Sequence, residues 1–347
     1  RFFFMAPLVA KARPSPRSKP APPSRAGPAG GLEVKLGSFR VQRTHGVDLS
    51  DTMGNLLFKD VITSVIELAA NSYDADASHV SISYNPSSDL LVIEDNGTGM
   101  DQEGVASFYR IGDSTKREAP VSDKGRRRIG EFGVATLALK ALCGHYVLET
   151  RKRGVCSAVE ETFQDRNRDD KPIQVRTRSC SRDARGTTIS MGHLKFLKDD
   201  RAFTADELKR RLAVELPIST EFSLTVNDQP VASANLGNTV EYIVDVRDRD
   251  VGRIVGSIFY SRRPLKEDAG IFIKVHGRAV GGRNLDIFGE AFNVGIARRV
   301  HGIVHADELR GLIGLDRQSF QRDHPKFKKV AAHIFDVLRQ IRYDNEE

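Results

Sequence analysis

The stretch "VITSVIELAANSYDA", residues 61–75, predicts a helix whose surroundings decide the fold. Most of its residues are apolar, which indicates burial on nearly every side. Four polar residues interrupt the pattern at spacings of four, four and three, which stacks their side chains on one helical face: Thr63, Glu67, Asn71 and Asp74. Such a stripe fits either a solvated helix face or a polar site built against a buried helix.

A strand–turn–strand pattern follows this helix. The runs "HVSISY" (79–84) and "LLVIED" (90–95) are separated by Pro, Ser and Asp residues, which is typical of a hairpin. The second run ends at Asp95 and continues into "EDNGTGM" (94–100), where Gly97 and Gly99 permit close approach of the backbone to a ligand. Taken alone, this glycine-containing box also fits a simple hairpin turn.

Two later segments have the composition of a ligand site. In "IGEFGVATLALK" (129–140), Gly130 and Gly133 open a predicted helix, and the unpaired N–H groups of such a helix start suit phosphate. In "RGTTISM" (185–191), Gly186 and Thr187 belong to a predicted strand. Glycines before a helix are a weak signal, and Thr187 also fits an ordinary strand position. The four segments together, in this order, are far more specific than any one of them.

These segments resemble the GHKL ATPase superfamily of gyrase B, the ninety-kilodalton heat-shock chaperone, histidine kinases and MutL. "ELAANSYDADASHVSI" resembles the N-box of the MutL and MORC branches, and "EDNGTGM" resembles the family's Asp-x-Gly-x-Gly box. "IGEFGV" and "RGTTISM" resemble the chaperone's lid segment and Gly-Thr strand. The resemblance implies an α+β protein with a Bergerat-type α/β sandwich ATPase domain, which we place at residues 33–200.

The resemblance also implies roles for the polar residues. Glu67 would be the general base for the attacking water, because a carboxylate in hydrogen-bond reach of that water can take its proton. Asn71 would ligate Mg²⁺ through its amide oxygen. Asp95 would accept a hydrogen bond from the adenine amine with support from the hydroxyl of Thr187. Asp74 would lie near the nucleotide or brace the site.

The glycine boxes and a long polar loop would surround the phosphates of ATP. Residues expected at the nucleotide are Gly97, Gly99, Met100, Gly130, Phe132, Gly133 and Val134. Ala135 departs from the chaperone pattern, which has another glycine there. The resemblance is therefore less specific for the residues that would contact phosphate than for Glu67 as the base. The loop 112–129 would be the ATP lid, and its basic residues would either reach phosphate or be solvated: Lys116, Lys124 and Arg126 to Arg128.

Residues 201–347 predict a second, smaller α/β domain of the transducer-like, ribosomal-protein type. Thr204 and Glu207 are spaced as a capping box at its first helix. "GIVHADELRGLIGLDRQSFQ" (302–321) resembles the chaperone's middle-domain catalytic loop, which implies catalytic roles for Arg317 and Gln321. Arg suits contact with a terminal phosphate because its planar fork is always charged. An exposed Arg near a helix start is the alternative. "IFIKVHGRAVGGRN" (271–284) resembles a strand–turn–strand of the same domain.

Composition limits the class of protein. The net charge is +7, but residues 1–32 hold six basic residues and no acid, so the remainder carries about +1. That Pro- and Ala-rich segment is expected to be a disordered tail, with a targeting segment or a misplaced start as alternatives. The three cysteines lack the spacing of a metal site, which favours reduced thiols. No apolar run is long enough to span a bilayer. These features predict a cytoplasmic protein that does not enter membranes.

The expected function is that of a Mg²⁺-dependent ATPase acting as a conformational switch. ATP would close the lid, and two protomers would form a dimer clamp on a client that is either protein, as for a chaperone, or DNA, as in DNA repair. A non-hydrolysing nucleotide-binding or scaffold module that works with a separate partner is the alternative. A sensor histidine kinase is disfavoured, because His45 is the only upstream candidate for a phospho-acceptor before the helix at 61–75.

Overall fold

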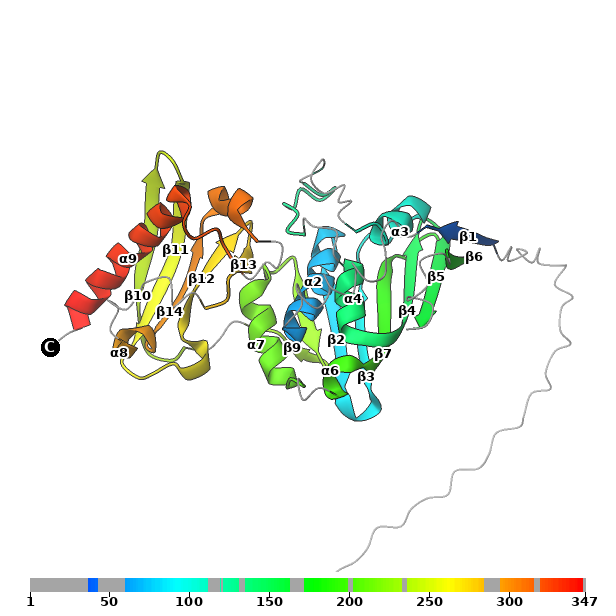
Figure 1. The fold of residues 1–347 in the computed structure, drawn as a ribbon, viewed down its shortest axis with the longest axis horizontal. Helices are drawn as coiled ribbons and strands as arrows, with labels where there is room; N and C mark the ends of the chain where they lie inside the picture. The colour runs from blue at the N-terminus through cyan, green and yellow to red at the C-terminus, as the bar shows by residue number, and fades with distance from the viewer. Residues whose placement is uncertain are drawn as a thin grey trace, which may run out of the picture. The chain divides into compact units, whose positions relative to one another are not determined.

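The computed structural model divides the chain into two units, Arg1–Val34 and Lys35–Glu347 (Figure 1). The structure describes residues 37–42, 60–111, 119, 121–130, 135–162, 172–198, 202–232, 236–283, 294–314 and 319–345. The predicted disordered tail and His45 therefore lie outside the described residues.

Within the described residues, a nine-stranded sheet forms the first domain. Its strands, in spatial order, are β1 (Gly37–Val41), β6 (Ile173–Ser179), β5 (Val155–Thr162), β4 (Cys143–Lys152), β7 (Gly186–Leu194), β3 (Leu90–Asp95), β2 (His79–Asn85), β8 (Ser223–Val226) and β9 (Gln229–Pro230). The predicted hairpin is confirmed, because β2 and β3 pair antiparallel with Val80 opposite Asp95. All neighbouring strands are antiparallel except β2 and β8, which pair in parallel.

Two helices, α2 (Val61–Asp74) and α4 (Ala135–Leu142), contact each other and pack against this sheet (Figure 1). Asp60 caps α2, its carboxylate accepting a hydrogen bond from the N–H of Ile62 at 3.1 Å. Because almost every residue of α2 is buried, the apolar composition of the stretch at 61–75 is explained by a central position in the core. The predicted α+β sandwich is thus the fold of the first domain.

A five-stranded sheet with its own hydrophobic core forms the second domain of the described chain. Its strands, in spatial order, are β10 (Thr239–Asp248), β11 (Gly252–Ser261), β14 (Val300–His305), β12 (Gly270–Val275) and β13 (Arg278–Val280). Helix α9 (Pro325–Asn345) packs on it through residues spaced by three or four, which is one helical stripe: Phe327, Val330, Ile334, Leu338 and Ile341. The remaining short helices are α3 (Gln102–Phe108), α6 (Lys195–Lys198), α8 (Val294–Ala297), η1 (Pro86–Ser88), η3 (Lys266–Asp268) and η5 (Asp307–Leu312).

The segment 202–232 belongs to the first sheet rather than to the second. Helix α7 (Ala205–Glu215) is capped by the hydroxyl of Thr204, which accepts from the N–H of Glu207 at 3.1 Å as predicted. Its buried Leu208 and Leu212 join the core of the first domain. The strands β8 and β9 then extend the first sheet beyond β2. The division between the two sheets therefore falls after β9, not at residue 200 as the sequence suggested.

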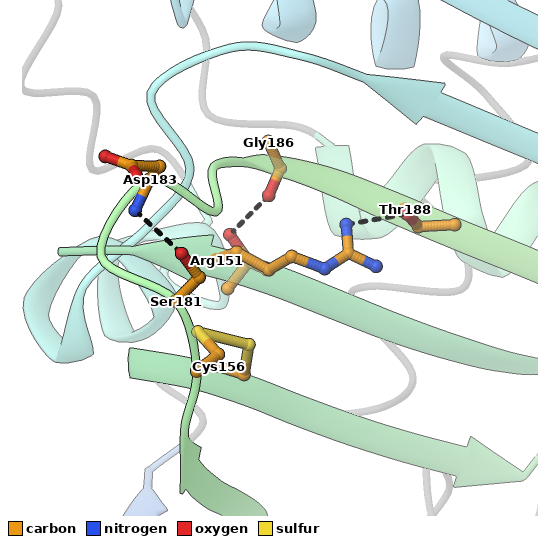
Figure 2. Close-up of a disulfide and its surroundings, with 8 residues drawn as sticks. Arg151, Cys156, Ser181, Asp183, Gly186 and Thr188 are labelled. Atoms are coloured by element: carbon orange, nitrogen blue, oxygen red, sulfur yellow. Dashed lines mark hydrogen bonds between the residues drawn. A yellow bond between two sulfur atoms is a disulfide. The ribbon is translucent and has the colours of Figure 1, made fainter. Parts of the chain in front are cut away.

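The cysteines differ from expectation. Cys156 on β5 and Cys180 just after β6 form a disulfide with a Cα–Cα distance of 5.8 Å, so the prediction of reduced thiols is wrong for this pair (Figure 2). Antiparallel pairing of β5 with β6 brings the two residues together, and this register is invisible in the cysteine spacing. Cys143 is buried and its thiol contacts the carbonyl of Leu139. None of the described helices is long and apolar enough to cross a membrane.

Candidate functional site

The polar stripe of α2 lies in the interior of the protein. Thr63, Glu67 and Asp74 are 1%, 6% and 5% exposed, and Asn71 is half-buried. This burial rules out a solvated helix face. A buried carboxylate needs partners that replace water.

Glu67 is bonded to an arginine of the second sheet. Nη2 of Arg278, on β13, donates to Oε1 of Glu67 at 2.6 Å, and Arg278 is only 2% exposed. Burial lowers the pKa of Arg278, but the carboxylates of Glu67, Glu215 and Asp74 more than offset this, so its pKa is raised and the guanidinium is charged. The sequence did not single out Arg278; the resemblance of "IFIKVHGRAVGGRN" to a strand–turn–strand was the one available signal.

Asp74 holds the start of the segment predicted to bind phosphate. Its Oδ1 accepts from the N–H of Ile129 at 2.7 Å and its Oδ2 from the N–H of Gly130 at 2.8 Å. Asp74 therefore braces the loop, one of the two roles that the sequence left open. The N–H of Gly130 is used in this bond, while Phe132, Gly133 and Val134 lie outside the described residues.

Thr63 belongs to a separate polar cluster at the start of α2. Its hydroxyl donates to Oδ2 of Asp60 at 3.0 Å, and Arg211 of α7 contacts both residues. Arg211 also bonds Glu215 on its own helix. This cluster fastens α7 to α2.

Asp95, the last residue of β3, is surrounded by hydrogen-bond donors. Oδ1 accepts from the N–H groups of Gly97 at 2.8 Å and Thr187 at 3.2 Å, and Oδ2 accepts from the hydroxyl of Ser72 at 2.9 Å. Burial raises the pKa of the Asp95 carboxyl above its ordinary value, although these hydrogen bonds lower it. Ser72 was missed because a buried serine beside the stripe has no distinguishing spacing.

Thr187 contacts Asp95 through its backbone, whereas the sequence predicted a contribution from the hydroxyl. That hydroxyl instead lies 3.1 Å from the hydroxyl of Thr150 on β4. Thr150 also accepts from the N–H of Met100 at 2.8 Å. The hydroxyls of Thr150 and Thr187 thus link Met100, at the end of the segment 94–100, to β7, which begins at Gly186.

Two glycines of the site are required by close backbone contacts. Gly99 has φ of +66°, and a Cβ there would lie 2.0 Å from the carbonyl oxygen of Arg151. Gly186 has φ of +101°, and a Cβ there would lie 2.0 Å from the carbonyl oxygen of Asp95. Any other residue would both strain the backbone and displace these strands, so the glycines fix the shape of the box around Asp95.

The described part of the predicted lid is fastened to the end of α2. The hydroxyl of Ser122 donates to Oδ1 of Asp76 at 2.5 Å, and Nζ of Lys124 donates to the carbonyl of Asp76 at 2.9 Å. Nη2 of Arg126 donates to the carbonyl of Glu221 at 2.6 Å, and its guanidinium lies 5.3 Å from the centre of the Tyr73 ring. These basic groups are thus engaged by the protein itself.

The other basic residues predicted in the lid contact protein groups as well. Nη1 of Arg127 lies 3.3 Å from Nδ1 of His276, and Nη1 of Arg128 donates to the carbonyl of Ala119 at 2.9 Å. Lys116 and Arg317 lie outside the described residues. Gln321 is exposed, and its N–H donates to the carbonyl of Leu312 at 2.9 Å.

One side-chain oxygen near Glu67, that of the Asn71 amide, suits a magnesium ion. The described residues contain no cluster of three or more His, Cys, Asp or Glu that would hold a metal through protein ligands alone. Mg²⁺ in nucleotide sites instead keeps several waters and takes one or two protein oxygens together with substrate phosphates. The half-buried amide of Asn71, one turn from Glu67, offers a hard oxygen donor of that kind.

Comparisons with known proteins agree with this geometry. Residues 60–187 match the family described as histidine kinase-, DNA gyrase B-, and HSP90-like ATPase. A stretch of 117 residues is 32% identical to the putative type II restriction enzyme HgiDII of Herpetosiphon aurantiacus. That match covers 32% of this chain and 19% of the relative, so the chain corresponds to about a fifth of that protein. The match to this GHKL-type ATPase family spans the stripe of α2 and the glycine-containing segments around Asp95.

Proposed function

We propose that the protein binds and hydrolyses ATP with Mg²⁺ and uses this cycle as a conformational switch. The observation that carries the proposal is the buried carboxylate of Asp95, held by three donors within a GHKL-type domain. A carboxylate fixed in this way is an acceptor of defined direction. It suits recognition of one base edge better than catalysis of proton transfer.

The number of hydrogen bonds that Asp95 accepts supports a role in adenine recognition. Two carboxylate oxygens offer about four acceptor sites, and the protein uses three of them. Oδ1 accepts two bonds and Oδ2 accepts one, so Oδ2 retains a site for the exocyclic amine of adenine. Guanine presents a carbonyl at that position, and a carboxylate would repel it.

Hydrolysis is assigned to Glu67. Its carboxylate would take the proton of the water that attacks the terminal phosphate, the role of a general base. Asn71 would hold Mg²⁺, which supplies positive charge to the phosphate oxygens when bound. Arg317 remains a predicted cation from the second domain, and Gln321 a predicted helper. Two protomers would close together as a clamp when ATP is bound.

We further propose that the client is DNA rather than a protein. The supporting feature is a set of arginines that strand register places on one face of the first sheet: Arg40, Arg151, Arg176 and Arg178. Strand register puts Arg176 and Arg178 on the face opposite the buried Val175, and Arg178 pairs through Cys156 with Arg151. Arg151 and the disulfide lie together in Figure 2.

Phosphate backbones are recognised by such arginine groups, and that binding weakens with salt. The similarity to HgiDII, a putative type II restriction enzyme, supports a DNA client as well. We would test the DNA proposal by measuring how tightly a labelled DNA duplex binds to a double variant, Arg176→Gln with Arg178→Gln. Arg253→Gln, on the second sheet, is the control. The double variant should bind DNA more weakly, and the slope of the logarithm of its binding constant against the logarithm of salt concentration should be smaller by about two. Equal binding by both variants would point to a protein client.

Steady-state ATP hydrolysis by the full chain, beside Glu67→Ala with nucleotide binding measured in both, tests the proposed ATPase. Loss of turnover in a variant that still binds ATP supports Glu67 as the base. ATP binding without turnover in either protein favours the non-hydrolysing module. Sedimentation with and without a slowly hydrolysed ATP analogue tests the clamp.

A further inference from the structure

Strand β10 forms one edge of the second sheet (Figure 1). All of its residues, Thr239–Asp248, pair antiparallel with β11 in one register without a bulge. On its other side, no strand of the described chain pairs with it. An open edge presents a row of unpaired backbone N–H and C=O groups, which can accept another strand.

The length of β10 sets it apart from the other edge strands of the described sheets. Proteins protect sheet edges with short strands, prolines or bulges. At the other edges, β13 has three residues and β1 has five, while β9 has two and includes Pro230. β10 has ten residues and contains no proline, so these forms of protection do not apply to it.

Apolar side chains are exposed along β10. Val240 is 53% exposed and Ile243 is 75% exposed. The hydroxyl of Tyr242 accepts a hydrogen bond from the amide of Asn345 on α9 at 3.0 Å, and Val244 is buried. Even-numbered residues of β10 therefore face α9, and odd-numbered residues, including Ile243, lie on the opposite face.

The odd-numbered face also carries charged side chains of both signs. Glu241, Asp245 and Arg247 are all exposed. Asp245 is already paired with Arg253 on β11 through two contacts of 3.0 Å. Arg247 makes no hydrogen bond or ion pair with another residue that the structure describes, so its charge is available to a partner.

This charge pattern is complementary to itself in one register. A two-fold axis perpendicular to the sheet at Val244 would place Glu241 opposite Arg247 of a second copy, and symmetry repeats that pair. An axis at Ile243 would instead place Glu241 opposite Asp245, and an axis at Asp245 would place that carboxylate opposite itself. Opposite charges stabilise cross-strand pairs and like charges destabilise them, so the pattern selects the axis at Val244.

We propose that β10 pairs with β10 of a second copy of this chain about a two-fold axis at Val244. Two chains then share one continuous antiparallel sheet. The interface uses the same strand from both copies, so the assembly closes at a dimer. It goes beyond the proposed function, because it needs no nucleotide, unlike the clamp that ATP would close.

Sedimentation equilibrium of the full chain without nucleotide tests the pairing, and the parent should form a dimer. Glu241→Arg and Arg247→Glu each place like charges opposite one another twice, so each should raise the dimer dissociation constant by about tenfold or more. The double variant exchanges the two charges and should return the constant close to that of the parent. Arg283→Glu, an exposed charge reversal beside β12, is the matched control and should dimerise like the parent.

Hydrogen exchange on the unmodified chain gives a second measurement that depends on no variant. Amides of Thr239–Asp248 should exchange more slowly as the protein concentration rises, while those of Gly37–Val41 on β1 should not change. A parent that stays monomeric, or a dimer that both single variants leave intact, would overturn the inference and leave the ATPase proposal in place. A double variant that dimerises no better than the single variants would overturn it as well.

Discussion

The hydroxyl of Ser72 on α2 donates a hydrogen bond to Oδ2 of Asp95 at the end of β3, with an oxygen–oxygen distance of 2.9 Å. Helix α2 therefore carries the predicted base, Glu67, and also helps to orient the predicted adenine acceptor. The two residues that we predict at opposite ends of the nucleotide thus lie on, or are bonded to, one helix. Substitutions along α2 can separate the two tasks.

Replacing Ser72 with Ala should weaken ATP binding. Asp95 would lose a hydrogen bond that lowers its pKa, so the pKa would rise further and the acid limb of ATP binding would move to higher pH. One hydrogen bond to a buried carboxylate corresponds to about 1.5–3 kcal/mol, so a several-fold or larger loss of affinity is expected by calorimetry. Ser64→Ala is the matched control, because its buried hydroxyl has no partner among the described residues.

Asp95→Asn should reduce ATP affinity by about 10- to 100-fold. An amide keeps one acceptor oxygen for the N–H groups of Gly97 and Thr187, so its NH₂ group would take the place of Oδ2 and oppose the amine of adenine. Glu94→Gln, at the exposed neighbouring position of β3, should bind ATP like the parent. Unchanged affinity of a folded Asp95→Asn variant would count against the adenine assignment.

Lys274 on β12 should make stability rise with pH in the alkaline range. Burial lowers the pKa of Lys274 from 10.5 to about 8. Between pH 8 and pH 10.5 the unfolded chain binds more protons than the folded protein, so the free energy of unfolding increases with pH across this window. The gain is about 3 kcal/mol at most. Denaturant unfolding of Lys274→Met beside the parent should show a flatter profile; parallel profiles would indicate that Lys274 is not responsible.

Gly99→Ala should damage the site far more than Gly125→Ala. Both glycines have positive φ, at +66° and +79°. A Cβ at Gly99 meets the carbonyl oxygen of Arg151 at 2.0 Å, whereas nothing lies within 4 Å of one at Gly125. The backbone cost of about 1–2 kcal/mol is common to both variants. Thermal melts and ATP binding measure the difference, and equal effects would mean that the contact with Arg151 is unimportant.

Local pattern in the sequence predicted much of the first domain. Alternation and helical spacing located α2, β2 and β3, and the end of β3 located Asp95. The same spacing placed the polar stripe on one face of α2, and the structure decided between the solvated and the buried alternative. These features depend on residues close together in the chain.

The parts that could not be predicted depend on long-range pairing. Arg278 reaches Glu67 across 211 positions, and the disulfide depends on the register of β5 with β6. The parallel pair of β2 with β8 likewise joins residues near 80 to residues near 224. Arg317 stays a prediction, because its segment lies outside the described residues.

The pairing of β8 with β2 sets where the ATPase domain can be cut. A fragment ending at residue 200 would leave β2 as an open edge strand, since its hydrogen-bonded neighbour Ser223–Val226 would be gone. It would also remove Leu208, Leu212 and Phe222 from the first core. Open edges and uncovered apolar residues promote aggregation. A stable fragment of the first domain therefore needs to extend through residue 232, past β9, so the polypeptide leading to the second sheet is itself a structural part of the first.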